Sequence, residues 1–139
     1  MNEYFECSVS FLETKEDGTE KKKSEVYLVS GVTFMDAEVK ITESILDIVK
    51  ELKIKAIKRV RVNEILPYDN ETCSWFKCKL DYITFDEKSG KEKKDRITML
   101  VEAKDIEGAN QMIQSHMRQS LSDYYIVSIT KSGIVDVFA

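Results

Sequence analysis

Apolar residues stand at every second position of the first segment of the chain, from Phe5 to Phe11. This alternation is typical of a strand with one buried face. A loop around Gly18 follows, and after it comes the apolar run Val26–Val29. The two apolar segments and the loop between them predict a hairpin with a long tip.

An amphipathic helix is predicted after the hairpin. Apolar residues recur at helical spacing within Phe34–Leu52, and again within Ile106–Tyr124 in the second half of the chain. Thr33 stands three residues before Asp36, which is a variant of the capping box, and Asp105 is in position to cap the second helix. Each half of the chain therefore predicts one helix with a defined first turn.

Each half closes with an extended segment. In the first half this segment covers Ile54–Val62, and in the second half it is divided into Tyr125–Thr130 and Ile134–Phe138. The residues between these last two segments, Lys131–Gly133, predict a turn or a bulge. The only proline of the chain lies in the linker that joins the halves.

The two halves are copies of one unit. Tyr4–Phe11 matches Trp75–Tyr82, with two aromatic residues and a cysteine at the same places. Beyond the loop glycines the register shifts by one residue, and Tyr27–Gly31 then matches Met99–Ala103. The sequence therefore predicts an α+β fold, a tandem duplication of a ββαβ(β) unit with antiparallel sheets, two helices and a pseudo-two-fold axis.

The repeats set the expected domain organisation. Residues 1–66 form the first ββαβ repeat, residues 67–74 the linker and residues 75–139 the second ββαβ repeat. A single unit of this size could bury its sheet only under one helix, whereas two packed units bury a larger fraction of their surface. We therefore expect the two repeats to pack as one compact domain.

Composition and charge narrow the classes of partner. The net charge of −4 argues against binding of polyanions by bulk charge, so a nucleic-acid site would need a local basic patch. No segment approaches the roughly 20 apolar residues of a membrane helix, and the acidic start of the chain does not fit a signal peptide. We expect a cytoplasmic protein without a membrane partner.

The three cysteines do not predict a metal site or a disulfide framework. Cys7 and Cys78 occupy matching inward positions of their strands, which favours two small buried hydrophobic residues. Cys73 lies in the linker and is expected to be an exposed thiol. No metal and no cofactor are expected.

No combination of residues predicts an enzyme. His116 is the only histidine and is matched by Ser44 in the first half, without a nucleophile at a recognisable spacing. Glu64 and Asp136 are matching carboxylates that could cap or form a salt bridge to a neighbouring strand. No catalytic residue is therefore assigned.

Basic and aromatic residues suggest a binding surface instead. Two aromatic residues share the outward parity of equivalent strands, and lysines and arginines flank them, which is a workable platform for stacking bases. The candidate nucleic-acid-binding residues are Tyr4, Trp75, Lys55, Lys58, Arg59, Lys77 and Lys79. In the alternative interpretation the lysines are a solvated surface that blocks edge-to-edge aggregation, and the two aromatic residues cover the junction between the halves.

The sequence therefore predicts a non-enzymatic intracellular binding module, with single-stranded nucleic acid as the first candidate partner. A protein partner is the alternative, with the chain acting as an interaction protein, and homo-oligomerisation stays open. A third hypothesis is a sponge for small nucleotides, bound in a pocket between the halves.

Three segments resemble a known family. They are Tyr4-Phe5-Glu6-Cys7-x-Val9, the stretch Glu25–Glu38 and the closing Ile57-Lys58 with Glu64-Ile65. They are similar to an uncharacterised domain-of-unknown-function family of small proteins from Bacteroides-group bacteria and their phages. The resemblance covers essentially the whole chain and implies a fold and a cytoplasmic setting, but no activity. The phages of this family imply one form of the protein-partner alternative, a phage accessory factor that acts against a host protein. At the level of fold, tandem sheet-plus-helix units are also similar to single-stranded nucleic-acid binders of the purine-rich-element type.

Overall fold

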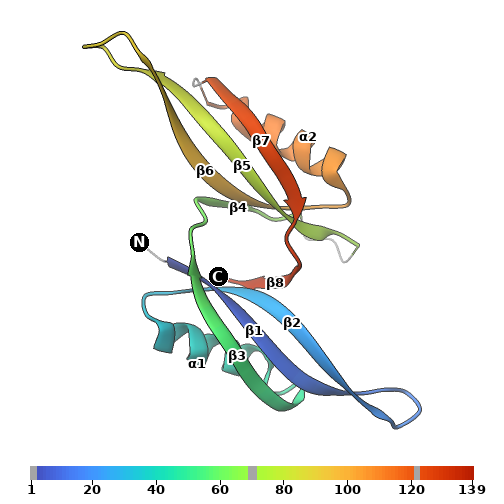
Figure 1. The fold of residues 1–139 in the computed structure, drawn as a ribbon. Helices are drawn as coiled ribbons and strands as arrows, with labels where there is room; N and C mark the ends of the chain where they lie inside the picture. The colour runs from blue at the N-terminus through green and yellow to red at the C-terminus, as the bar shows by residue number, and fades with distance from the viewer. Residues whose placement is uncertain (1–2, 69–71, 121–122) are drawn as a thin grey trace. The chain divides into compact units, whose positions relative to one another are not determined.

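Two helices and two mostly antiparallel four-stranded sheets make up the described part of the chain, residues 3–68, 72–120 and 123–139 of a computed structural model (Figure 1). The predicted α+β class is thus confirmed, and the order of elements agrees with a tandem ββαβ repeat. In chain order the elements are β1 (Glu3–Thr14), β2 (Glu20–Gly31), α1 (Phe34–Ile45), β3 (Lys50–Val60), β4 (Glu64–Leu66), β5 (Ser74–Phe85), β6 (Glu92–Ala103), α2 (Ile106–Met117), β7 (Asp123–Lys131) and β8 (Ile134–Phe138).

Each repeat contributes its last strand to the sheet of the other repeat. One sheet has the order β3-β1-β2-β8 and the other the order β4-β6-β5-β7. Strand β8 runs parallel to β2, and β4 runs parallel to β6. The chain consequently folds into two compact units, which we name unit 1 (residues 1–61 and 134–139) and unit 2 (residues 62–133).

The compact units and the sequence repeats have different boundaries. The repeats at 1–66 and 75–139 follow chain order, whereas the units follow strand pairing. The difference arises because Glu64–Leu66, at the end of the first repeat, pairs with β6 of the second repeat. In the same way Ile134–Phe138, at the end of the second repeat, pairs with β2 of the first.

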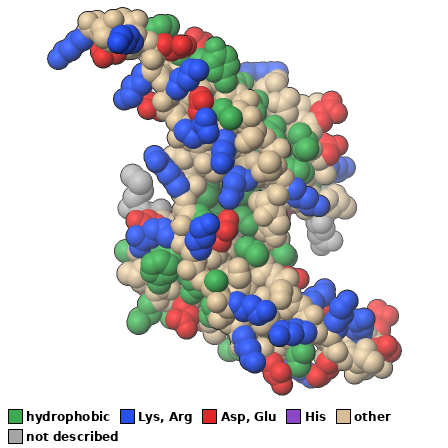
Figure 2. Space-filling view, in the orientation of Figure 1, with side chains coloured by type: hydrophobic (Ala, Val, Ile, Leu, Met, Phe, Trp, Pro, Cys, Tyr) green, Lys and Arg blue, Asp and Glu red, His purple; other side chains and the backbone are tan. Residues whose placement is uncertain are grey.

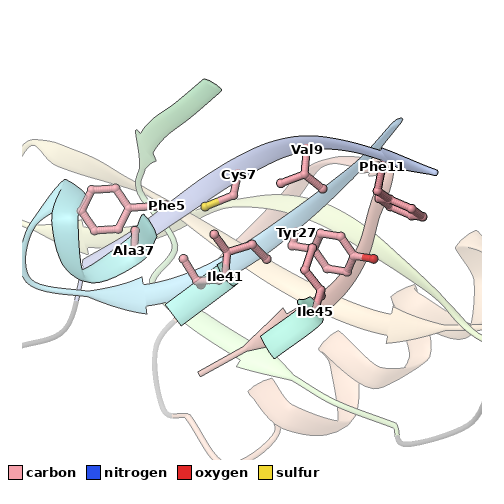
Figure 3. Close-up of a cluster of buried hydrophobic side chains, with 9 residues drawn as sticks. Phe5, Cys7, Val9, Phe11, Tyr27, Ala37, Ile41 and Ile45 are labelled. Atoms are coloured by element: carbon pink, nitrogen blue, oxygen red, sulfur yellow. The ribbon is translucent and has the colours of Figure 1, made fainter. Parts of the chain in front are cut away.

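The core of unit 1 lies between α1 and one face of its sheet. Alternate residues of Phe5–Phe11 point toward the helix, which meets them with Ala37, Ile41 and Ile45 (Figure 3). Ala37 and Ile41 are completely inaccessible to solvent. Burial of each large aliphatic side chain contributes about 1.5–3 kcal/mol, so this layer is a major source of the stability of the unit.

Unit 2 repeats this packing at the matching positions. Phe76, Cys78 and Leu80 of β5 face α2, which buries Ala109 and Ile113 against them. The alternation in each first strand and the helical spacing after it therefore predict the observed cores.

Both predicted helix caps are present. The Thr33 hydroxyl accepts a hydrogen bond from the Asp36 backbone N–H at 3.1 Å, and the Asp36 carboxylate accepts one from the Thr33 N–H at 3.0 Å. At α2, the Asp105 carboxylate accepts a hydrogen bond from the Gly108 N–H at 2.7 Å. Each cap satisfies backbone donors that the first helical turn leaves unpaired.

The inserted residue lies in the tip of the second hairpin. Strand β5 begins 71 positions after β1, whereas β6 and α2 begin 72 positions after β2 and α1. The loop that joins the two strands covers residues 15–19 in the first hairpin and residues 86–91 in the second. Gly18 and Gly90 turn these loops with positive φ angles of 86° and 66°, a conformation that glycine adopts at little cost.

Cys7 and Cys78 are buried, as predicted from their inward positions. Burial disfavours the thiolate and raises the pKa of each thiol from 9.0 to about 11. Cys73 is half-buried. The three thiols therefore differ in reactivity because of their positions in the fold.

Removal of β8 is expected to open unit 1 and to leave unit 2 folded. A chain that ends at Gly133 loses the Phe138 ring, which stacks on Tyr27 at a centroid distance of 5.5 Å, and exposes the outer edge of β2. Hydrogen exchange should show loss of protection in β2 and retained protection in β5 and α2. As a control, Val135→Ala removes a side chain that is 50% exposed and should change little. Full protection of β2 in the shortened chain would contradict the strand exchange.

Thiol titration should separate the cysteines. At pH 8 a disulfide reagent is expected to modify Cys73 rapidly, and Cys7 and Cys78 only after denaturation, because the folded state keeps Cys7 and Cys78 protonated and buried. Rapid modification of all three thiols in the folded protein would show that the strand cores open readily.

The pH also changes what the two buried thiols contribute to the free energy of unfolding. Since the pKa values of Cys7 and Cys78 are higher in the folded than in the unfolded chain, this contribution is complete below pH 9 and falls as the pH rises toward 11.

Candidate functional site

Strand β3 is the most basic element of the protein. It is an edge strand of the unit 1 sheet, and its 11 residues contain a single acidic residue, Glu51. The basic residues of the strand are Lys50, Lys53, Lys55, Lys58 and Arg59, and Arg61 follows directly. The edge of the sheet therefore carries a local concentration of positive charge in a protein that is acidic as a whole.

Three lysines of β3 are exposed and have no ion-pair partner among the described residues: Lys53, Lys55 and Lys58. By contrast, Lys50 lies 3.8 Å from a carboxylate oxygen of Glu20. The register places Lys53 and Lys58 on the face of the sheet away from α1, because their cross-strand neighbours on β1 are Ser10 and Glu6, whose side chains alternate with the core residues of that strand. We call these three residues the β3 lysine row.

Arg59 belongs to a different environment. It pairs with Phe5 across the strands and so lies on the helix face, where its guanidinium stands 5.5 Å from the Phe5 ring centroid and 5.3 Å from that of Phe34. The Arg59 Nε also lies 2.9 Å from the Glu3 carboxylate oxygen Oε2. Arg59 therefore helps to close the end of the core, and the pleat of the strand separates it from Lys58.

The two predicted aromatic residues differ in exposure. Tyr4 is half-buried and shares its face of the sheet with Lys58, because Tyr4 and Glu6 are alternate residues of β1. Trp75 is only 6% exposed, which leaves little of its ring for stacking a base. Of the remaining predicted residues, Lys77 is half-buried and Lys79 is exposed, and both lie in unit 2 with Trp75.

The lysines of the hairpin arms are interleaved with acidic residues (Figure 2). The Lys23 Nζ lies 2.7 Å from the Glu13 carboxylate oxygen Oε2, and Arg96 contacts Asp81 across the strands of the second hairpin. The Arg96 guanidinium holds the pKa of the Asp81 carboxyl below its usual value. These arms are solvated, charge-balanced surfaces, as the alternative interpretation of the sequence expects.

The second repeat provides a natural comparison for β3. Its equivalent edge strand, β7, contains a single basic residue, Lys131, and exposes Tyr125 and Val127 by 56% and 46%. An edge strand of this fold therefore does not require a row of lysines. The β3 lysine row is a property of unit 1 alone.

A second feature joins His116 of α2 to Glu64 of β4. The imidazole Nε2 contacts the Glu64 carboxylate oxygen Oε2, whose surroundings are otherwise closed. The contact lacks the angles of a well-formed hydrogen bond, so we describe it as a contact that becomes an ion pair when His116 is protonated. Strand exchange creates this pair, because it places the end of the first repeat beside the helix of the second.

The equivalent residues of unit 1 do not form such a pair. The Ser44 hydroxyl donates to the Lys40 carbonyl at 2.7 Å, within its own helix, and Asp136 accepts a hydrogen bond from the Val137 N–H. The sequence predicts no contact between His116 and Glu64, because nothing in it indicates that β4 pairs outside its own repeat.

A cavity of about 780 Å³ lies beside this pair in unit 2. Its wall on α2 includes Gln111, Met112 and His116, and the opposite wall is formed by Leu66 and Tyr68. Acidic and basic residues both line it, so its chemistry does not select one class of ligand. The His116–Glu64 contact at its side is best explained as an anchor that holds β4 on unit 2.

The chain matches one family model, described as "Domain of unknown function (DUF4494)", over residues 3–139. The chain belongs to this family. Its description names no activity, so the roles of residues in this DUF4494 domain rest on geometry. No curated protein matches the chain, and no solved structure does.

Two properties of the DUF4494 domain bear on the class of site. Within residues 3–68, 72–120 and 123–139, no helix has the length and apolar character needed to cross a membrane. In the same part of the chain, no three His, Cys, Asp or Glu side chains converge as a metal site would require. The β3 lysine row is the candidate site because it concentrates exposed positive charge on one strand.

A double-mutant cycle should measure the anchor on β4. With His116→Ala, Glu64→Ala and the double variant, we expect a coupling free energy of about 0.2–1 kcal/mol, because both side chains are more than one-third exposed. The same cycle on the equivalent residues, Ser44→Ala with Asp136→Ala, is the matched control and should give a coupling close to zero. Equal coupling in both cycles would exclude a specific anchor.

Proposed function

We propose that the protein binds single-stranded nucleic acid along β3. The observation that carries the proposal is the β3 lysine row, which is exposed, unpaired among the described residues and absent from the equivalent strand β7. Unpaired lysines on an edge strand attract a polyanion without first breaking an ion pair. Lys53 and Lys58 lie opposite Ser10 and Glu6, four positions apart on β1, so the row extends over about 13 Å, enough for a few consecutive phosphates.

Tyr4 is the aromatic residue that supports this mode of binding. It lies on the same face as Lys58, and part of its ring is exposed, so a base can stack there while its phosphate meets the lysine. The burial of Trp75 and the position of Arg59 over the rings of Phe5 and Phe34 give these residues other surroundings. The proposed site is therefore smaller than the sequence alone suggested, and it lies within unit 1.

The electrostatics set the expected strength and salt dependence. Three lysines that neutralise three phosphates of a single strand give a slope of about −2 for log K against log salt concentration. The net charge of −4 reduces attraction elsewhere on the surface. Binding should therefore be weak, local and independent of sequence, and supported by stacking rather than by hydrogen bonds to base edges.

The proposal includes the setting in which such binding takes place. A cytoplasmic location and an origin in Bacteroides-group bacteria or their phages accompany it, as the resemblance of the sequence implies. A non-enzymatic role accompanies it as well, in line with the residue types of the sequence. An intracellular binding module of this type would act by occupying single strands and would need no cofactor.

Charge reversal of the β3 lysine row tests the proposal. The variant K53E/K55E/K58E is expected to lose binding of a labelled single-stranded oligonucleotide by at least about 100-fold at low salt, since each phosphate contact contributes to a strongly salt-dependent affinity. Fluorescence anisotropy at several salt concentrations measures both the affinity and the slope.

The matched control is K15E/K21E/K22E, which changes the charge equally on exposed lysines of the first hairpin. It should keep the slope and most of the affinity of the original chain. If both triple variants weaken binding equally, bulk charge rather than β3 is responsible. If the unmodified chain binds no oligonucleotide at low salt, the proposal fails outright.

A further inference from the structure

Helix α1 exposes an apolar stripe on the side that does not face the core. Met35, Val39 and Leu46 are 73%, 50% and 53% exposed. Residues at these spacings fall within about 40° of one another around a helix of 3.6 residues per turn. The helix therefore has a second apolar side besides the one that packs on the sheet, and we name these three residues the outer stripe.

The second repeat shows that the fold does not need the outer stripe. The two helices bury matching residues, with Ala37 and Ile41 of α1 corresponding to Ala109 and Ile113 of α2. The positions that correspond to the outer stripe are instead polar in α2, namely Glu107, Gln111 and Arg118. Two helices in the same packing environment thus both bury apolar residues at the matching core positions, but differ in polarity on the side that the core does not use.

Exposed apolar surface continues beyond both ends of α1. Val32, just before the helix, is 65% exposed, and Ile48, just after it, is 77% exposed. Large apolar residues scattered singly on a surface are ordinary, but several on one short helix and at its ends are typical of an interaction surface.

The charges around the outer stripe are mostly negative. The helix and its ends carry four acidic residues, Asp36, Glu38, Glu43 and Asp47. The one basic residue among them is Lys40, whose ammonium donates a hydrogen bond to the Ser30 hydroxyl at 2.8 Å. An acidic rim repels a second copy of the same helix and an anionic lipid surface, and it attracts a basic segment.

We propose that the outer stripe of α1 docks a basic amphipathic helix of a partner protein. The apolar side of the partner helix would cover Met35, Val39 and Leu46, and its lysines or arginines would meet the acidic rim. A helix of 12 residues is about 18 Å long, so about three turns of the partner suffice. This surface differs from the β3 lysine row in both charge and polarity, so the inference does not depend on nucleic-acid binding.

The probe is a labelled 15-residue helical peptide with leucines on one side and lysines on the other, titrated by fluorescence anisotropy. The decisive variant gives α1 the residues that α2 carries at the same positions, M35E/V39Q/L46R, which leaves the net charge unchanged. We expect binding to weaken by more than about tenfold, because a buried apolar side chain is worth roughly that factor in affinity. Circular dichroism with thermal melting verifies that the variant folds.

Two further measurements separate the contributions. A peptide with glutamate in place of each lysine should bind at least about tenfold more weakly than the basic peptide, and E38K/E43K should reduce that preference. Equal binding of both peptides, or unchanged binding by the triple variant, overturns the proposal. So does a dimer in sedimentation that the triple variant converts to a monomer, since the stripe would then be covered by a second copy. K53E/K55E/K58E should bind the peptide normally, which keeps this test independent of the nucleic-acid site.

Discussion

The fold depends on the pairing of β2 and β6 with strands that come from the other repeat. In unit 1, β3 and the position of β8 lie at opposite edges of the sheet, about 14 Å apart across three strand spacings. The end of β3 pairs with Tyr4, near the end of β2, whereas a strand parallel to β2 must start near Val26, about 13 Å further back. The strand that follows β3 after three residues would therefore have to cross about 19 Å, more than four peptide steps can span. Each repeat is unable to complete its own sheet, and exchange solves this for both.

Local rules were enough to predict the type and order of the elements, but not all of their ends. The helical spacing continues to Leu52 and Tyr124 in the sequence, whereas α1 ends at Ile45 and α2 at Met117, and both Leu52 and Tyr124 belong to the strand after the helix. The alternation in Phe5–Phe11, the capping pair Thr33 and Asp36, and the one-residue shift at the hairpin tip all depend on neighbouring residues, so the sequence displays them directly. The exchange of β4 and β8 depends on distances across a sheet and on the length of the segment that joins each of these strands to the strand before it. Nothing in Glu64–Leu66 itself distinguishes pairing with β2 from pairing with β6, and so the contact between Glu64 and His116 could not be predicted.

The candidate binding surfaces show the same division. The charges of β3 are visible in the sequence, but the side chains they contact are not. Arg59 differs from Lys58 because the pleat of the strand directs it over the Phe5 and Phe34 rings. Duplication explains why the surfaces can differ at all, since both copies must keep the core positions while each is free to change the rest. Strand β3 and the outer side of α1 are where the first copy departs from the second.

The exchange of strands also reverses the order in which the chain can be completed during synthesis. Domains generally fold from the N-terminus as they leave the ribosome. Here unit 2 has all its strands and its helix once Lys131 has emerged, while unit 1 still lacks β8. Unit 1 therefore begins to form before unit 2 but is completed after it, and the edge of β2 stays unpaired until β8 has been translated. A nascent chain would need to protect that edge, and the polar hairpin arm of β2 limits what could pair with that part of it in the meantime.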